Sequence, residues 1–277
     1  MTAVAPTLTE GLALEGVTVR FGGHVAVNGL SLAAPLGRLT GLIGPNGAGK
    51  TTTFNACSGL ERASAGRLFL GGEDVSALGP AARSRRGLGR TFQRMELFDS
   101  ITVAGNLAVG REAGLAGLNP LRHLWATPKE RADTRRRVDD ALARCGLEDV
   151  ADELVGVLST GRRRLVELAR VIASGARMVL LDEPSSGLDS NETRRFGRIL
   201  RSLVEEDGIG ILLVEHDMTL VMSVCDYLYV LDFGVLIFEG TPTDVHDSPV
   251  VRAAYLGELD TGDSGDTPAP PGDPEGR

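Results

Sequence analysis

Short apolar runs alternate along this chain with amphipathic segments. Residues 178–181 and 211–214 are entirely apolar, which is typical of strands covered on both faces of a sheet. A third apolar run, residues 39–43, leads directly into a glycine-rich segment, and a helix is predicted to follow over residues 49–58. Strands that alternate with helices predict a parallel sheet and therefore an α/β core.

Further strands are predicted near both ends of the chain. Residues 12–32 favour strands that break at Phe21-Gly22-Gly23. Residues 227–231 and 235–239 flank a turn and predict a β-hairpin. Its turn, Asp232-Phe233-Gly234, superficially matches a protein-kinase motif, but no H-R-D catalytic loop accompanies it, so we interpret it only as a turn.

The middle of the chain follows a helical pattern. Thr127 is placed to be an N-cap, Pro128 to occupy the first turn and Glu130 to close a capping box. This helix should extend to about Cys145 and stop at Gly146.

A second helix is expected over residues 163–174, because its apolar residues fall on one stripe: Leu165, Leu168, Ala169 and Ile172. We therefore expect a largely helical lobe over about residues 96–175, inserted into the α/β core.

The two ends of the chain differ from the rest in composition. Residues 1–10 are short and polar, and residues 258–277 are acidic and rich in proline and glycine, so both segments are expected to be disordered.

Composition excludes some classes of protein. The net charge of −8 disfavours a non-specific nucleic-acid binder, which needs a basic surface to neutralise phosphates. Cys57, Cys145 and Cys225 are few and far apart, which favours small buried side chains in a reduced protein over a disulfide framework or a zinc site. No apolar run reaches the roughly 18 residues that could span a bilayer.

The glycine-rich segment matches the phosphate-loop pattern G-x-x-x-x-G-K-[ST]. Glycines let backbone N–H groups turn toward phosphates, and the following helix points its positive end at the same anion. Lys50 would contact the β- and γ-phosphates of ATP, and Thr51 would bind Mg²⁺. The complete set of predicted ATP-binding residues in this loop is Gly44, Pro45, Asn46, Gly47, Ala48, Gly49, Lys50, Thr51 and Thr52.

Two alternatives bear on this loop. A chance glycine-rich turn would not need the strand before it or the helix after it, and both are predicted here. A guanine-specific enzyme would carry an N-K-x-D motif, which the chain lacks. Adenine is therefore the preferred base.

Candidate hydrolytic residues follow two of the predicted strands. Asp182 ends the strand at residues 178–181 and is the predicted Mg²⁺ ligand. Glu183 comes next and is the candidate general base for the attacking water. His216 follows the strand at residues 211–214 and is placed to reach the γ-phosphate and that water. A lone histidine is usually structural, but this position favours a catalytic role.

Taken together, these residues resemble the ATP-binding subunits of ATP-binding cassette transporters, over about residues 12–257. The decisive segment is Leu158-Ser159-Thr160-Gly161-Arg162, which is similar to the family signature L-S-G-G-Q. The resemblance implies a single cassette over residues 11–257: a P-loop core with an antiparallel β subdomain and an inserted α-helical subdomain.

The resemblance also implies roles for further residues. Ser159 and Gly161 would bind the γ-phosphate held by a second cassette subunit, identical or paralogous. Phe21 would stack on adenine, and Gln93 would contact Mg²⁺ and sense the membrane partner. Ser186 and Asp189 would lie on the loop that crosses between subunits. Thr160 and Arg162 depart from the usual glycine and glutamine of the signature.

Finer features, such as the segment Arg90-Thr91-Phe92-Gln93, look similar to the ATPases of branched-chain amino-acid importers. The resemblance then implies a peripheral protein on the cytoplasmic face of the cell membrane. Permease subunits would contact it near residues 93–98, and a solute-binding protein would act indirectly. The alternatives are an ATPase for export of lipid or polysaccharide, a soluble cassette ATPase that does not drive transport, and a regulatory nucleotide binder that does not hydrolyse.

Overall fold

A computed structural model describes residues 10–92, 95–115 and 127–260 of the chain. Its strands are β1 (Leu12–Phe21), β2 (His24–Ala34), β3 (Leu39–Ile43), β4 (Ala65–Leu70), β5 (Glu73–Asp74), β6 (Leu88–Arg90), β7 (Met178–Asp182), β8 (Gly210–Val214), β9 (Tyr227–Asp232) and β10 (Val235–Gly240). Its α-helices are α1 (Lys50–Ser58), α2 (Pro80–Ser84), α3 (Val103–Leu115), α4 (Pro128–Cys145), α5 (Thr160–Ala173), α6 (Ser190–Asp207), α7 (Met218–Val224), α8 (Pro242–Asp247) and α9 (Pro249–Asp260).

The described strands form two sheets. One has four antiparallel strands in the order β2-β1-β4-β5. The other has six strands in the order β10-β9-β3-β8-β7-β6, all parallel except β10, which pairs antiparallel with β9. The predicted core strands and the hairpin are confirmed, and so is the α/β fold class with its antiparallel β part and its helical part.

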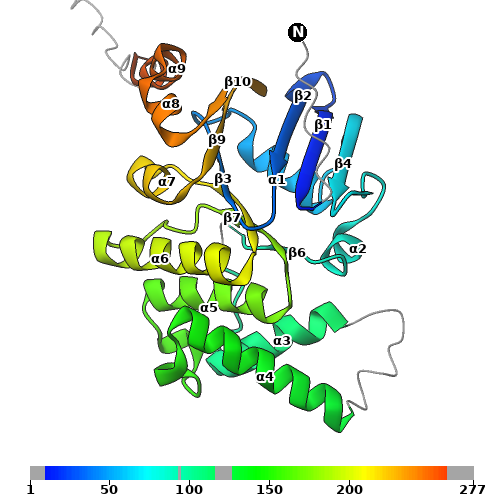
Figure 1. Cartoon of the computed structure of the whole chain (residues 1–277), viewed down its shortest axis with the longest axis vertical. Helices are drawn as coiled ribbons and strands as arrows, with labels where there is room; N and C mark the ends of the chain where they lie inside the picture. Colours follow the sequence, from blue (N-terminus) through cyan, green and yellow to red (C-terminus); the bar gives the residue numbers. More distant parts are fainter. Residues whose placement is uncertain (1–9, 93–94, 116–126, 261–277) are drawn as a thin grey trace, which may run out of the picture.

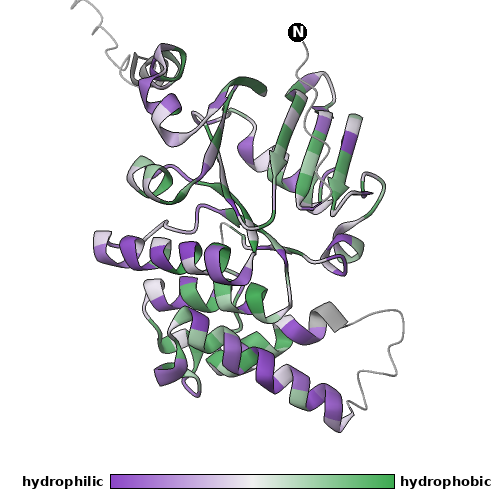
Figure 2. Cartoon of the chain, in the orientation of Figure 1, coloured by the Kyte–Doolittle hydropathy of each residue, from purple (hydrophilic) through white to green (hydrophobic). Residues whose placement is uncertain are grey.

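The helices α3, α4 and α5 pack together at the end of the molecule away from the four-stranded sheet (Figure 1). Figure 2 shows hydrophilic outer faces on α4 and α6 and hydrophobic strands in the middle of the molecule. The outer polar stripe of each helix and its inner apolar stripe explain why these segments are helical and which face they bury.

Two apolar clusters cover opposite faces of the six-stranded sheet. Val179 and Leu181 belong to the cluster shared with α3–α6, whereas Met178 and Leu180 belong to the cluster beneath the four-stranded sheet. Since side chains alternate between the faces of a strand, this division shows that β7 is covered on both sides. The continuous apolar runs of the sequence follow from that burial.

Both ends of α4 are as predicted, whereas the start of α5 differs from the prediction. The Thr127 side chain accepts from the Glu130 N–H at 3.2 Å, the Glu130 carboxylate accepts from the Thr127 N–H at 2.8 Å, and α4 ends at Gly146, all as predicted. The predicted start of this helix, residue 163, is wrong, because α5 begins three residues earlier, at Thr160. Ser159 is its N-cap, because its hydroxyl accepts from the Arg162 N–H at 3.4 Å.

The three cysteines are free and buried, as expected. Burial raises the pKa of the Cys57 and Cys145 thiols to about 12. Within the described ranges, no helix combines the length and the apolar character needed to cross a membrane. Gln93 and most of both segments expected to be disordered lie outside the described residues.

Candidate functional site

The glycine-rich loop joins the end of β3 to the start of α1, as the phosphate-loop pattern requires. Gly44 has φ of 148° and Gly49 has φ of 96°, in the region that L side chains rarely adopt. A Cβ at Gly44 would lie 2.1 Å from the Leu231 carbonyl oxygen, and one at Gly49 would lie 2.5 Å from the Ala26 carbonyl oxygen. Both positions therefore require glycine, for backbone angle and for space.

The loop presents cationic and donor groups at the N-terminus of α1. The Lys50 side chain is buried, and its Nζ donates to the carbonyl oxygens of Gly44 at 2.6 Å and Pro45 at 2.8 Å, inside the curve of the loop. Gly49, the N-cap of α1, supplies no side-chain acceptor for the first N–H groups of the helix. Such N–H groups at a helix N-terminus favour an anion such as phosphate. Thr51 is exposed, so its side chain is accessible from the loop.

The predicted hydrolytic residues come together at the carboxyl ends of two neighbouring strands. Asp182 is the last residue of β7 and is 2% exposed, and Glu183 follows it. The Glu183 carboxylate Oε1 lies 2.7 Å from His216 Nε2. This contact matches the expected cooperation of the two residues, although their catalytic roles stay predictions.

Glu183 also has an unusual backbone. Its φ is 48°, a left-handed value that non-glycine residues rarely adopt. The surrounding structure holds it there, because the Glu183 N–H donates to the Val214 carbonyl oxygen at 2.9 Å. Strained backbone of this kind persists only where the surrounding structure holds it, and it clusters at functional sites.

Glu215 is a site residue that the sequence reasoning missed. It is 3% exposed, and its two carboxylate oxygens accept from the Ser185 N–H at 2.7 Å and the His216 N–H at 3.0 Å. It therefore joins the loop after β7 to the loop after β8. In the sequence, Glu215 could have been identified because it is a carboxylate placed directly between an apolar strand and the candidate histidine.

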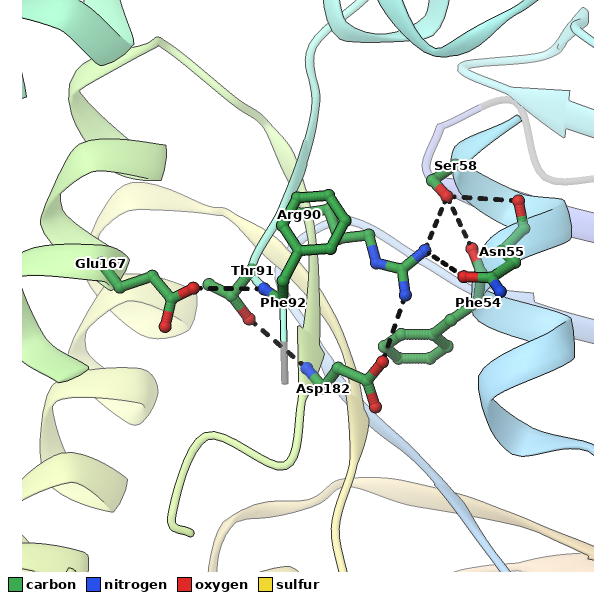
Figure 3. A network of polar contacts seen from close by, with 8 residues as sticks. All are labelled: Phe54, Asn55, Ser58, Arg90, Thr91, Phe92, Glu167 and Asp182. Carbon is green, nitrogen blue, oxygen red and sulfur yellow. Dashed lines mark hydrogen bonds and ion pairs between the residues drawn. The ribbon is translucent and has the colours of Figure 1, made fainter. Parts of the chain in front are cut away.

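Arg90 is the second missed residue (Figure 3). Its Nη2 donates to Asp182 Oδ2 at 3.1 Å, and its Nη1 donates to Asn55 Oδ1 and to Ser58 Oγ at 2.8 Å each. Burial raises the pKa of the Asp182 carboxyl, and the Arg90 charge opposes that increase. The buried pair thus places the Asp182 side chain, with Arg90 against it, where a Mg²⁺ ligand is predicted.

The signature segment and the predicted dimer loop lie beside each other. Ser159 is exposed at the start of α5, while a Cβ at Gly161 would lie 2.2 Å from the Glu192 side chain on α6. Asp189 is the N-cap of α6, and Ser186 is exposed three residues before it. The structure therefore groups these four residues where the α5 and α6 N-termini meet.

The remaining predicted contacts have different outcomes. Phe21 ends β1 and is 47% exposed, so its ring has an open face for a base. Gln93 lies outside the described residues. Thr51 and Asp182 are oxygen donors, which suits Mg²⁺. Together they would hold the ion, which would neutralise part of the phosphate charge.

A largely parallel core sheet, a phosphate loop between β3 and α1, and two acids at the end of β7 in the same sheet define a P-loop nucleotide hydrolase. The comparisons with known proteins narrow this class. The family described as ABC transporter matches residues 27–186. The chain belongs to the ABC transporter family, as one of its ATP-binding subunits.

Relatives align over almost their whole length. The chain is 38% identical over 250 residues to the high-affinity branched-chain amino acid transport ATP-binding protein BraF of Pseudomonas aeruginosa, which covers 89% of this chain and 98% of that protein. It is 34% identical over 251 residues to the lipopolysaccharide export system ATP-binding protein LptB of Acidithiobacillus ferridurans, covering 91% of this chain and 98% of that protein.

The fold is similar to that of a solved cassette. The ADP conformation of MJ1267, an ATP-binding cassette of an ABC transporter, superposes with a TM-score of 0.79 at 30% identity, covering 90% of this chain and 99% of that chain. The predicted family, fold and enzyme class are therefore confirmed: the chain binds ATP and hydrolyses it as the motor subunit of a transporter.

Proposed function

We propose that this chain drives the import of amino acids, with branched-chain amino acids as the substrate class. The observation that carries the proposal is the 38% identity to BraF over nearly the full length of both proteins. The similarity to LptB is lower, at 34%, so export of lipopolysaccharide is the second candidate. The solute itself would be selected by membrane and solute-binding subunits, which are other chains.

In this proposal ATP lies on the loop from Gly44 to Thr52, with Phe21 against its base. Lys50 contacts the β- and γ-phosphates, while Thr51, Asp182 and Gln93 hold Mg²⁺. Glu183 accepts a proton from the attacking water. His216 lies 2.7 Å from the Glu183 carboxylate, close enough to fix its direction.

The site is completed by a second cassette subunit. Ser159 is exposed at the N-terminus of α5, in the helical part of the molecule, and the phosphate loop opens α1 on the other side of the six-stranded sheet. We infer that Ser159 and Gly161 contact the γ-phosphate held by the partner, with Ser186 and Asp189 on the crossing loop. Two ATP molecules would then lie between two head-to-tail subunits.

Membrane subunits would dock on the helical part. Phe98, Leu154 and Val157 are exposed apolar side chains, and Val157 is 73% exposed. Their segments are joined by hydrogen bonds from the Gly156 N–H to the Asp99 carbonyl and from the Val155 N–H to the Ile101 carbonyl. An exposed apolar patch next to residues 93–98 supports the proposed contact with permeases on the cytoplasmic face of the membrane.

Uptake of radiolabelled leucine by cells that carry this gene tests the proposal. Replacing the chromosomal copy with Lys50→Ala should abolish high-affinity leucine uptake and leave uptake of an unrelated sugar intact. The matched control is Arg62→Ala, a substitution of another cationic residue outside the phosphate loop. Wild-type leucine uptake in the Lys50→Ala strain would overturn the assignment, and a simultaneous defect in the outer membrane would favour the export alternative.

A further inference from the structure

The Arg90 guanidinium lies where three elements meet. It ends β6, and its side chain is 8% exposed beside the 3% exposed side chain of Asp182 on β7. Asn55 and Ser58, its other two partners, lie on successive turns of α1, the helix that the phosphate loop opens. A single side chain therefore connects the strand that leads toward residue 93, the phosphate-loop helix and the predicted metal ligand (Figure 3).

Contacts other than the one with Asp182 hold this guanidinium in position. Nη1 donates to two acceptors on α1, and the guanidinium carbon lies 5.8 Å from the ring centre of Phe54 and 5.0 Å from that of Phe92. Rings at these distances attract a cation. Two hydrogen bonds and two rings thus leave Arg90 with Nη2 as a fixed donor toward the β7 strand end.

Among the residues that the structure describes, the carboxylate of Asp182 is held through one of its two oxygens. Oδ2 accepts from Arg90, and within the described part of the chain Oδ1 makes no hydrogen bond. A Mg²⁺ ligand needs one oxygen free and the carboxylate plane fixed, and partners of this kind orient the ligands that touch the metal. We propose that Arg90 is a positioning residue for the metal site, which holds Asp182 by Oδ2 so that Oδ1 is presented to Mg²⁺.

The ion pair between Arg90 and Asp182 is not of the kind that stabilises a fold. The buried Arg90 Nε–H has no hydrogen-bond partner among the described residues, and burial lowers the pKa of this guanidinium. Unpaired buried donors destabilise a fold, and buried ion pairs often contribute less than apolar side chains of the same volume. A charged group that costs free energy at this position is better explained by what it does to Asp182.

Arg83 provides the comparison within the same chain. It is 2% exposed and also contacts α1, but its guanidinium donates to backbone carbonyl oxygens, those of Ala56 and Cys57 at the end of the helix and that of Leu78. Among the described residues, none of its hydrogen-bond partners is a metal-ligand candidate. Arg83 and Arg90 are therefore two buried arginines anchored on one helix, of which only Arg90 reaches the carboxylate.

The inference rests on the proposed role of Asp182 as a Mg²⁺ ligand, so the test must separate the two. Binding of a fluorescent ATP analogue to the purified chain is titrated with Mg²⁺ and measured again in EDTA. Arg90→Gln should weaken the apparent Mg²⁺ affinity roughly 10–100-fold, the usual effect of removing a group that orients a metal ligand. Its nucleotide affinity in EDTA should stay that of the wild type, and Arg90→Lys should recover part of the Mg²⁺ affinity.

The controls decide between outcomes. Arg83→Gln should lower the melting temperature and leave the Mg²⁺ titration unchanged. Asp182→Asn should remove the Mg²⁺ effect, and adding Arg90→Gln to it should have no further effect on Mg²⁺ affinity.

If Asp182→Asn keeps the wild-type Mg²⁺ titration, the assignment of Asp182 as the metal ligand is wrong. If only Asp182→Asn responds, or if Arg90→Gln weakens binding equally in EDTA, the positioning role is overturned. Should Arg90→Gln not fold, Arg90→Lys is read by the same criteria.

Discussion

At the scale of single residues, the proposed chemistry assigns different roles to two consecutive carboxylates, whose surroundings differ. Asp182 is enclosed and paired with Arg90, while the Glu183 side chain is 20% exposed and contacts His216. The first is suited to hold an ion in a fixed direction, and the second can reach water. Glu183 follows the last residue of β7 and has a left-handed backbone, with φ of 48°.

The role of Glu183 can be tested without changing its shape. Glu183→Gln should keep ATP binding and reduce hydrolysis about 10²–10⁴-fold, because the amide cannot accept the proton from water. Phosphate release and nucleotide binding are measured on the same preparation. Glu205→Gln, an exposed carboxylate on α6, is the control and should hydrolyse ATP normally. Unchanged turnover in Glu183→Gln would remove this residue from the proposed chemistry.

At the scale of elements, local signals determined what could be predicted. Both ends of α4 follow from a capping box and a terminal glycine, which act within a few residues. The start of α5 was misplaced because Thr160 and Gly161 are poor helix formers, whereas the Ser159 cap and packing against α6 extend the helix over them.

The burial of Arg90 could not be predicted for a related reason. Residues 83–90 carry several arginines in a short stretch, which by itself indicates a solvated segment. Arg83 and Arg90 are enclosed while Arg85 and Arg86 are exposed, and the difference arises from contacts with α1 and β7 that are distant in sequence. Motifs therefore located the phosphate loop and the strand-end acids, but not the side chains that orient them.

The contact of β6 with α5 makes a prediction at this scale. A Cβ at Gly89 would lie 2.4 Å from Val171 Cγ1 and 2.8 Å from Ala176 Cβ. Gly89→Ala should lower the free energy of unfolding by about 1–3 kcal/mol through overpacking, as measured by urea denaturation. Gly23→Ala, at a position where a Cβ meets nothing within 4 Å, is the matched control. Equal stability of the two variants would show that β6 is not held against α5.

At the scale of the whole molecule, the two groups of predicted nucleotide-binding residues belong to different layers. The phosphate loop lies with the cluster under the four-stranded sheet, and the signature opens a helix whose apolar side packs into the other cluster. Each layer packs on its own apolar cluster, and this packing keeps Ser159 and the phosphate loop of one chain on opposite faces of the six-stranded sheet. The arrangement instead favours two chains that exchange these surfaces.

Shared sites make activity depend on protein concentration. If hydrolysis needs two subunits, the specific ATPase activity of the isolated chain should rise with its concentration and level off once the dimer dominates, since mass action sets the dimer population. The measurement is phosphate release across a dilution series, with the sedimentation coefficient recorded on the same samples in Mg²⁺ and ATP. Ser159→Arg places a large cation on the exposed face of the signature, and it should lower activity at every concentration while leaving ATP binding intact. Specific activity that stays constant down to concentrations where only monomer sediments would refute the shared site, and it would require that the residues of one chain suffice for hydrolysis.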